Sequence, residues 1–273
     1  MRKFRPNHGC APQSELTMPD IKTRLEIAQK IAIAASDIPM EYFRTPLDVT
    51  SKSDDSPVTA ADQATEKAIR SALEQAFPGE SILGEEFGQT GLSDDMWIVD
   101  PIDGTRSFIT GLPLFGMLLG YMSRGETQIG VINMPALGEV YAGAQGIQAT
   151  MNGQPISVSS CRSLDQARLF INEGDKMAVE TPKQFARLVT AGATRRMAAD
   201  CYPHALVAAG HADAVVDYGL QPYDYLPVAA VVEAAGGIMT DWQGQPLTLT
   251  SDGRTLTAAT PQLHQALLEL VRP

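Results

Sequence analysis

The chain has 273 residues, of which 44% are hydrophobic and 19% charged, a composition typical of a folded globular protein. Its 32 acidic residues outnumber the 21 basic ones, and the formal net charge of -11 has the wrong sign for a protein that binds nucleic acid. No apolar run reaches the roughly 18 residues of a membrane-spanning helix, and the N-terminus shows no apolar signal-peptide core. We therefore expect no nucleic-acid partner and no association with a membrane.

Cysteine and histidine are sparse and do not cluster. The three cysteines form no CxxC pair, a pattern more typical of a reducing cytoplasm than of a disulfide framework. The four histidines show no HExxH-like spacing. These patterns favour a cytoplasmic protein without a zinc site.

The N-terminal part of the chain predicts an arm followed by two helices. Residues 1–19 are rich in proline and lack apolar periodicity, so we expect a loose arm outside the fold. From Asp20, apolar residues recur at steps of three and four and predict a helix that Pro39 would end. A polar, breaker-rich loop at residues 51–57 precedes a second predicted helix over residues 61–76.

Beyond residue 80 the hydrophobic period shortens to that of strands. Gly-containing turns separate the predicted strands, which cover residues 81–83, 96–99, 115–122, 128–133 and 139–142. A helix pair followed by a meander of strands is typical of an α+β layer.

After the turn signal at Asn152-Gly153, helices and strands alternate. The predicted helices lie near residues 181–189, 203–209, 224–235 and 262–271, and the predicted strands cover residues 214–216, 238–240 and 255–259. We place a boundary near residues 150–160, between an N-terminal α+β subdomain (20–155) and a C-terminal α/β subdomain (156–273).

The segment WIVDPIDGT, from Trp97 to Thr105, carries the strongest chemical signal. A short apolar strand delivers Asp100 and Asp103 across a proline-stiffened turn, so both carboxylates can face one point. Gly104 allows a close approach of the backbone, and a helix beginning at Thr105 could hold an anion. Asp-Pro and Asp-Gly are also common turn dipeptides, and in that alternative Asp100 and Thr105 only cap the chain.

Two further acids, Glu85 and Asp224, are candidates to lie near Asp100 and Asp103. Glu85 ends the preceding strand, and neighbouring strand ends would bring it close to Asp100 and Asp103. Such a concentration of negative charge in a poorly solvated cleft requires hard cations, and all-oxygen donors favour Mg²⁺ over zinc. A solvated acidic surface is the alternative. Asp224 precedes an apolar run and by itself is more typical of a helix N-cap.

Taken in order, these motifs resemble the inositol monophosphatase family of Mg²⁺-dependent, lithium-sensitive phosphatases. The resemblance runs from about Lys22 to Leu270 and is carried by TAAD at 59–62, GEE at 84–86, WIVDPIDGT at 97–105, PYD at 222–224 and EAAGG at 233–237. It implies an α/β/α/β/α layered sandwich of the inositol monophosphatase and fructose bisphosphatase type, commonly a homodimer.

The resemblance also implies a metal centre. It assigns the side-chain metal ligands to Glu85, Asp100, Asp103 and Asp224, with Ile102 binding through its carbonyl, for two or three Mg²⁺ per site. Lys52 lies in the loop where the family often has a lysine near a labile metal.

The implied mechanism is direct hydrolysis by an activated water, without a covalent enzyme intermediate. Thr105 and Glu85 would orient the water and accept its proton, while Asp62 would hold Thr105. The backbone at Gly104 and Thr105 would cradle the phosphate.

Within the family, three stretches look most like the histidinol-phosphate phosphatase branch: 106–116, 200–202 and 221–226. Inositol phosphatases usually have Asn where Arg106 stands and Trp where Tyr223 stands. Histidinol phosphate carries an ammonium and an imidazole, which suit Asp200 and Asp217, although the family usually has a longer Glu at the latter position.

The predicted substrate contacts are therefore Gly104, Thr105, Arg106, Asp200, Asp217 and Asp224. The predicted reaction is the hydrolysis of L-histidinol phosphate to L-histidinol, a step of histidine biosynthesis. The alternatives are an inositol-1-phosphate or broad sugar-phosphate phosphatase, or a metal-binding scaffold without turnover.

Overall fold

The computed structural model describes residues 19–46, 50–51 and 57–273. Apart from Pro19, the predicted N-terminal arm lies outside the described residues, and so does Lys52. Within the described residues, no helix is both long and apolar enough to cross a membrane.

Three helices precede the first large sheet: α1 (Ile21–Ala35), α2 (Asp37–Tyr42) and α3 (Ala60–Ala76). Asp20 caps α1 by accepting a hydrogen bond of 2.8 Å from the backbone nitrogen of Thr23. The prediction that Pro39 ends the first helix is wrong. The helix ends at Ala35, and Pro39 lies in the first turn of α2, where its missing N–H removes no helical hydrogen bond.

In the described part of the chain, eight strands form the larger sheet, in the order β10-β9-β8-β7-β6-β5-β3-β4. Their bounds are β3 (Ser81–Gly84), β4 (Gly88–Thr90), β5 (Met96–Asp103), β6 (Gly116–Ser123), β7 (Glu126–Met134), β8 (Glu139–Ala144), β9 (Ile147–Met151) and β10 (Gln154–Pro155). Only β3 and β5 pair in parallel among them. Two short strands, β1 (Thr50–Ser51) and β2 (Pro57–Val58), form a separate pair.

Both faces of the larger sheet are buried. Trp97 and Val99 of β5 pack with α1 and α3, whereas Ile98 between them joins the core on the opposite face, with α7 (Tyr202–Ala208) and α8 (Pro222–Ala234). Strands buried on both faces read as continuous apolar runs, which explains the sequence of β5. A Cβ added at Gly130 of β7 would lie 1.9 Å from the Pro227 carbonyl oxygen, so this glycine lets α8 lie directly on the sheet.

The smaller sheet has the order β12-β11-β13-β15-β14 within the described chain. It consists of β11 (Arg168–Ile171), β12 (Thr194–Met197), β13 (Ala214–Asp217), β14 (Ile238–Asp241) and β15 (Thr255–Ala258). Its outer face carries α5 (Gly174–Glu180), α6 (Pro182–Leu188) and α9 (Pro261–Val271). The sequence pattern did not predict β11, β12 or α5.

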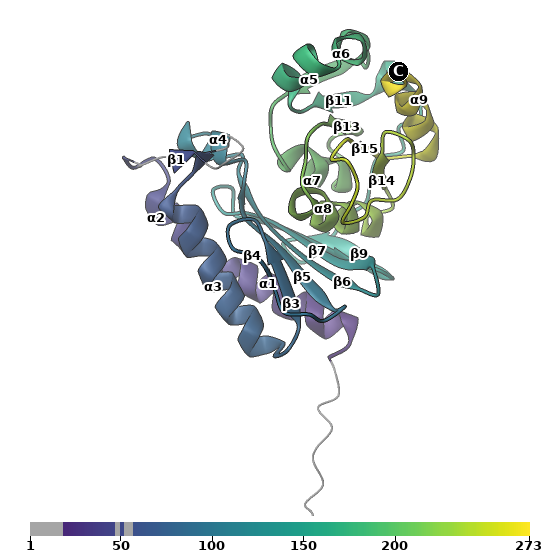
Figure 1. Ribbon diagram of the computed structural model, residues 1–273. Coiled ribbons are helices and arrows are strands. Elements are labelled where there is room, and N and C mark those ends of the chain that lie inside the picture. Colours follow the sequence, from purple (N-terminus) through teal and green to yellow (C-terminus); the bar gives the residue numbers. More distant parts are fainter. Residues whose placement is uncertain (1–18, 47–49, 52–56) are drawn as a thin grey trace, which may run out of the picture.

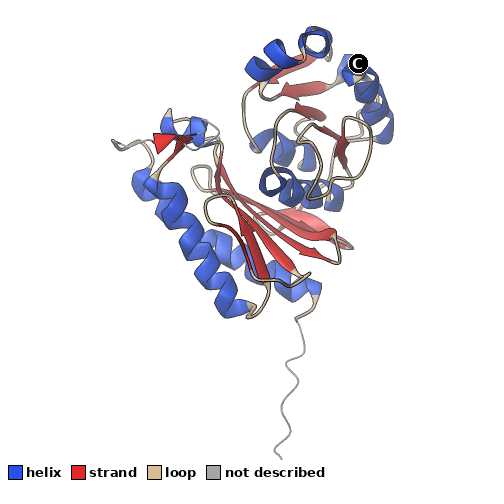
Figure 2. Ribbon diagram, viewed as in Figure 1, coloured by secondary structure: helices blue, strands red, loops and turns tan. Residues whose placement is uncertain are grey.

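Figures 1 and 2 show the layers in order: α1 and α3, the larger sheet, α7 and α8, the smaller sheet, and the outer helices. The predicted α/β/α/β/α sandwich is confirmed. We propose to divide the chain after Pro155, where β10 completes the larger sheet. Since α8 of the second subdomain packs on the larger sheet, the two subdomains share a core.

Candidate active site

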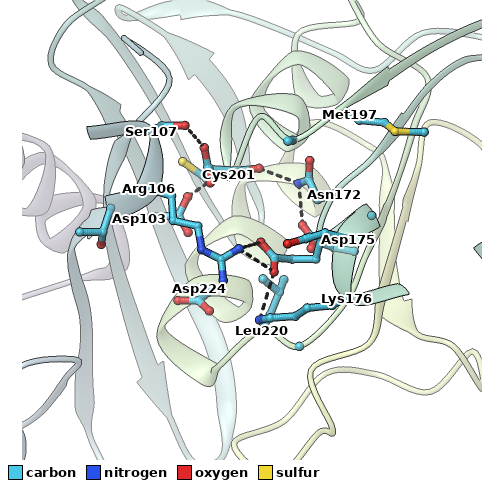
Figure 3. A pocket seen from close by; sticks show the side chains of 18 of the residues that line it. Asp103, Arg106, Ser107, Asn172, Asp175, Lys176, Met197, Cys201, Leu220 and Asp224 are labelled. Atoms are coloured by element: carbon cyan, nitrogen blue, oxygen red, sulfur yellow. Dashed lines mark hydrogen bonds and ion pairs between the residues drawn. The ribbon is translucent and has the colours of Figure 1, made fainter. Parts of the chain in front are cut away.

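A pocket of about 770 Å³ lies between the two subdomains. The larger sheet contributes the ends of β3 and β5 together with the short helix α4 (Thr105–Ile109), and the second subdomain contributes α7, α8 and the segments after β11, β12 and β13. Figure 3 shows side chains from both subdomains converging on this pocket. Acids that are far apart in the sequence line its wall: Glu85, Asp100, Asp103, Asp200, Asp217 and Asp224.

Three of these acids meet at one point. Among the described residues, Asp100, Asp103 and Asp224 place one carboxylate oxygen each within 4.8 Å of one another. Residues three apart in a regular strand point to opposite faces of a sheet. The pairing of β5 with β6 shifts in register between Asp100 and Asp103, and this irregularity lets both side chains reach the same pocket.

The electrostatics of this cluster favour a bound cation. Burial, followed by the charges of Glu85 and Asp224, raises the pKa of Asp100 well above its ordinary value. Burial and the charge of Asp224 do the same to the pKa of Asp103, and burial raises the pKa of Asp224 to about 7. All three grouped donors are carboxylates, a set that fits Mg²⁺ or another hard divalent cation.

Glu85 lies next to this cluster, because β3 and β5 run in parallel with Gly84 opposite Val99. Its backbone nitrogen donates a hydrogen bond of 3.2 Å to the Val99 carbonyl, which continues the ladder by one residue. Its charge raises the pKa of both Asp100 and Asp224. Glu85 thus lines the pocket beside the three grouped carboxylates.

Asp62 and Thr105 also approach each other, from α3 and α4. Asp62 is fully buried in the capping box of α3 and accepts hydrogen bonds from the nitrogen of Thr59 at 2.8 Å and its hydroxyl at 2.6 Å. The Thr105 hydroxyl lies 3.4 Å from the other Asp62 oxygen and 3.1 Å from the Ile102 carbonyl. Burial, more than the nearby charge of Glu85, raises the pKa of Asp62.

Gly104 and Asp200 meet across the subdomain boundary. Gly104 has a φ of +82°, and a Cβ there would lie 2.7 Å from the Asp200 carboxyl carbon. Asp200 accepts a hydrogen bond of 2.5 Å from the Ser107 hydroxyl (Figure 3). Burial, with the charge of Asp217, raises the pKa of Asp200 to about 6. Only a glycine at position 104 leaves room for this contact.

Asp217 and Arg106 both have partners within the protein. Asp217 is buried and accepts hydrogen bonds from the Asn172 amide at 2.7 Å and from the Tyr218 nitrogen at 2.8 Å. Arg106 is exposed at the rim, and its Nη1 lies 3.2 Å from each oxygen of Glu173. This ion pair connects the two subdomains across the pocket mouth (Figure 3).

Sequence reasoning missed several pocket residues, notably Asn172, Glu173 and Lys176. They follow β11, whose apolar sequence Leu169–Ile171 is followed by the polar run Asn172–Asp175. A short apolar strand followed by polar residues is the pattern that identified Glu85 and Asp100. Because β11 itself was not predicted, this signal was overlooked.

Layered sheets with carboxylates that converge at their strand ends form a site that can hold a hard divalent cation. Residues 20–273 match the sequence pattern of the inositol monophosphatase family, so the chain belongs to this family. It is a phosphoric monoester hydrolase.

The similarity to individual proteins extends over nearly the whole chain. The sequence is 38% identical to a histidinol-phosphatase of Chlorobaculum parvum, over 93% of this chain and 96% of that protein. It is 36% identical to the chloroplastic bifunctional phosphatase IMPL2 of Arabidopsis thaliana, over 97% of this chain and 80% of the plant protein. An inositol monophosphatase structure from Zymomonas mobilis matches with a TM-score of 0.83 and 35% identity, covering 93% of this chain and 99% of the other. These matches confirm the predicted family and support its histidinol-phosphatase branch.

Proposed function

We propose that the protein is a Mg²⁺-dependent phosphatase that converts L-histidinol phosphate to L-histidinol and phosphate. The observation that carries this proposal is one pocket in which three grouped carboxylates lie beside a further acid, Asp200. A phosphate ester with a positively charged alcohol part suits such a pocket, because metal ions attract the phosphate and an acid attracts the cation. The similarity to a histidinol-phosphatase points to the same substrate.

The metal site would consist of Asp100, Asp103 and Asp224, completed by Glu85 and by the carbonyl of Ile102, and would hold two or three Mg²⁺. Carboxylate and carbonyl oxygens are the ligands that Mg²⁺ prefers. When bound, Mg²⁺ supplies Lewis-acid polarisation of the phosphate and increases the acidity of water.

Proton transfer would be the task of Glu85, Thr105 and Asp62. The Thr105 hydroxyl can donate its proton to either of two acceptors, the Ile102 carbonyl or the Asp62 carboxylate. Its oxygen is then free to accept a hydrogen bond from the attacking water and orient it. Glu85 would take the proton of that water. Since water itself attacks phosphorus, no covalent enzyme intermediate is required.

The substrate would lie between the metal site and the rim. Its phosphate would approach the backbone of Gly104 and Thr105 at the start of α4, beside Asp224. Its ammonium would bind Asp200, whose carboxylate is at the pocket wall. Arg106 would contact the substrate at the rim of the pocket, where the guanidinium already pairs with Glu173. Direct contact with Asp217 remains a prediction, since that carboxylate already accepts protein hydrogen bonds.

The second candidate is an inositol-1-phosphate or broad sugar-phosphate phosphatase, and the similarity to the Zymomonas mobilis inositol monophosphatase favours it. Such an enzyme would use the same metal ligands with a different substrate. The homodimer and the cytoplasmic location remain predictions from the sequence.

A phosphate-release panel in Mg²⁺ separates the candidates. It compares histidinol phosphate, inositol 1-phosphate, fructose 1,6-bisphosphate and phosphoadenosine phosphate by kcat/KM. We expect histidinol phosphate to be hydrolysed with the highest kcat/KM. A higher kcat/KM for inositol 1-phosphate would refute the proposed substrate and support the second candidate.

A further inference from the structure

Asn172 lines the pocket and lies at the centre of a buried hydrogen-bond network. It follows β11, and its backbone nitrogen donates a hydrogen bond of 3.0 Å to the Val216 carbonyl of β13. Its side chain is only 3% exposed. A buried amide of this kind must have its polar atoms satisfied, and here the protein satisfies them.

The Asn172 amide connects two structural elements. Its nitrogen donates to the Asp200 carbonyl at 2.8 Å and to the Asp217 carboxylate at 2.7 Å, while its oxygen accepts from the Ala199 nitrogen at 3.2 Å. Both partners of the nitrogen are acceptors and the partner of the oxygen is a donor, so the orientation of the amide is fixed. An aspartate at this position could not make the two donor contacts.

The segment that Asn172 holds is a loop of unusual backbone conformation. Ala198 and Asp200 have φ values of 54° and 51°, in the left-handed region that non-glycine residues rarely occupy. Such conformations persist only where surrounding contacts fix them. We call residues 198–201 the left-handed loop.

The left-handed loop places two groups in the proposed active site. The Cys201 nitrogen donates a hydrogen bond of 2.7 Å to Asp103, one of the three grouped carboxylates. The Asp200 carboxylate accepts a hydrogen bond from Ser107 of α4, which belongs to the other subdomain. A displacement of the loop would therefore move both the support of Asp103 and the carboxylate of Asp200.

Asp217 anchors the other end of the network. Its carboxylate accepts from the Tyr218 nitrogen at 2.8 Å and lies 3.2 Å from Nε2 of His204, whose Nδ1 is 2.8 Å from the Thr257 hydroxyl. Through His204, these contacts connect Asp217, the last residue of β13, to α7 and β15 of the second subdomain.

We propose that Asn172 is a positioning residue for the phosphatase reaction: by bridging Asp217 and the left-handed loop, it holds Cys201 against Asp103 and Asp200 in the pocket. The inference rests on the proposed metal site but not on the identity of the substrate. Through this bridge, Asp217 supports the reaction without needing to touch the substrate.

The test compares Asn172→Ala with a matched control, Asn133→Ala. Asn133 is also buried, and its amide donates to the Ala32 carbonyl at 2.9 Å and the Ser36 hydroxyl at 2.7 Å, but it does not line the pocket. Three quantities are measured on the full chain: the melting temperature, kcat/KM for p-nitrophenyl phosphate, and Mg²⁺ affinity by titration calorimetry.

We expect both substitutions to lower the melting temperature. Asn172→Ala should also lower kcat/KM about tenfold or more and weaken Mg²⁺ binding severalfold, whereas Asn133→Ala should change either quantity less than about twofold. Equal losses in the two variants, or unchanged catalysis in Asn172→Ala, would overturn the proposal.

A double variant separates the contact between Asn172 and Asp217 from the contact between Asn172 and the Asp200 carbonyl. Asn172→Asp combined with Asp217→Asn restores a donor and an acceptor between the two positions but leaves the Asp200 carbonyl without its donor. We expect it to recover the melting temperature lost in Asn172→Asp without recovering kcat/KM. Recovery of both together would show a role in stability alone. p-Nitrophenyl phosphate has no cationic group, and calorimetry needs no turnover. These measurements therefore do not depend on whether histidinol phosphate is the substrate, which the phosphate-release panel tests separately.

Discussion

The backbone N–H of Cys201 donates a hydrogen bond of 2.7 Å to Oδ2 of Asp103, across 98 residues of sequence. Asp103 ends β5 of the larger sheet, and Cys201 immediately precedes α7 of the second subdomain. The bond therefore links the subdomains at the carboxylate cluster, so that the geometry of the cluster depends on how they pack.

Asp103→Asn should abolish Mg²⁺-dependent phosphate release and leave the fold intact. The substitution keeps the shape of the side chain and an oxygen that can accept from Cys201, but it removes one negative charge from a crowded cluster. Because like charges repel strongly in a poorly solvated site, the metal-free variant should melt at a higher temperature than wild type. Phosphate release and a thermal melt in chelator check both parts.

A control for this variant is Asp213→Asn. Asp213 is buried outside the pocket and pairs with Arg168 at 2.7 Å, so its replacement should lower stability without abolishing activity. Near-normal turnover of Asp103→Asn at saturating Mg²⁺ would contradict the proposed metal site.

Mg²⁺ should stabilise the protein by binding only the folded state. At a concentration about a hundredfold above Kd, the expected gain is about 2.7 kcal/mol, or roughly 5–10 °C in Tm for a chain of this size. Thermal melts with and without chelator measure the shift. Chelation should silence phosphate release and lithium should inhibit it; persistence of activity in excess chelator argues against the mechanism.

The metal-free protein should lose stability as pH rises from about 4 to about 7. The folded-state pKa is about 7 for Asp224 and about 6 for Asp200, both above the ordinary value of 3.8. Between the unfolded and folded pKa values the folded state binds more protons, so the free energy of unfolding decreases with increasing pH. The stabilising contribution is complete below about pH 4 and lost above about pH 7.

Thermal melts in chelator across this pH range measure the effect. Asp224→Asn should flatten part of the curve, because it removes a buried carboxyl whose pKa is raised to about 7. Mg²⁺ should reverse the trend, since it binds the ionised carboxylates. A metal-free protein whose stability rises steadily with pH would show that these acids are not buried together.

Asp200→Asn should lower kcat/KM for histidinol phosphate much more than kcat/KM for p-nitrophenyl phosphate. If Asp200 binds the ammonium of histidinol phosphate, removing its charge forfeits a charge-assisted hydrogen bond of roughly 1.5–3 kcal/mol, or about ten- to a hundredfold in kcat/KM. The rate on p-nitrophenyl phosphate should change little. Asp217→Asn, which disturbs the bridge through Asn172, should instead lower both rates to a similar degree. Steady-state kinetics on the two esters distinguish these patterns.

From the sequence, local patterns predicted the candidate acids of the larger sheet, and the family resemblance predicted the layered fold. Glu85 and Asp100 stand at the ends of short apolar strands, whereas Asp224 was assigned to the metal site only by the resemblance. The WIVDPIDGT segment is the clearest example, because one strand and one turn deliver Asp100, Asp103 and Gly104 together. Ordered motifs over the whole chain then indicated the family.

Other features depended on contacts between distant parts of the chain. Local periodicity could not show that Pro39 lies at the start of a new helix, or that β11 and β12 pair in the smaller sheet, since short strands acquire their stability from their neighbours. For the same reason Asn172 was missed.

Only the tertiary structure decided which hydrogen-bond partners each acid of the pocket has. Asp200 and Asp217 look alike in sequence, yet Asp200 lies beside Gly104 and accepts from Ser107 of the other subdomain, whereas Asp217 accepts from Asn172 and Tyr218. Hydrogen bonding and burial arise when the two subdomains pack, because their partners come from strands and helices far apart in the chain. Sequence thus specifies the chemical groups, and packing assigns each its environment.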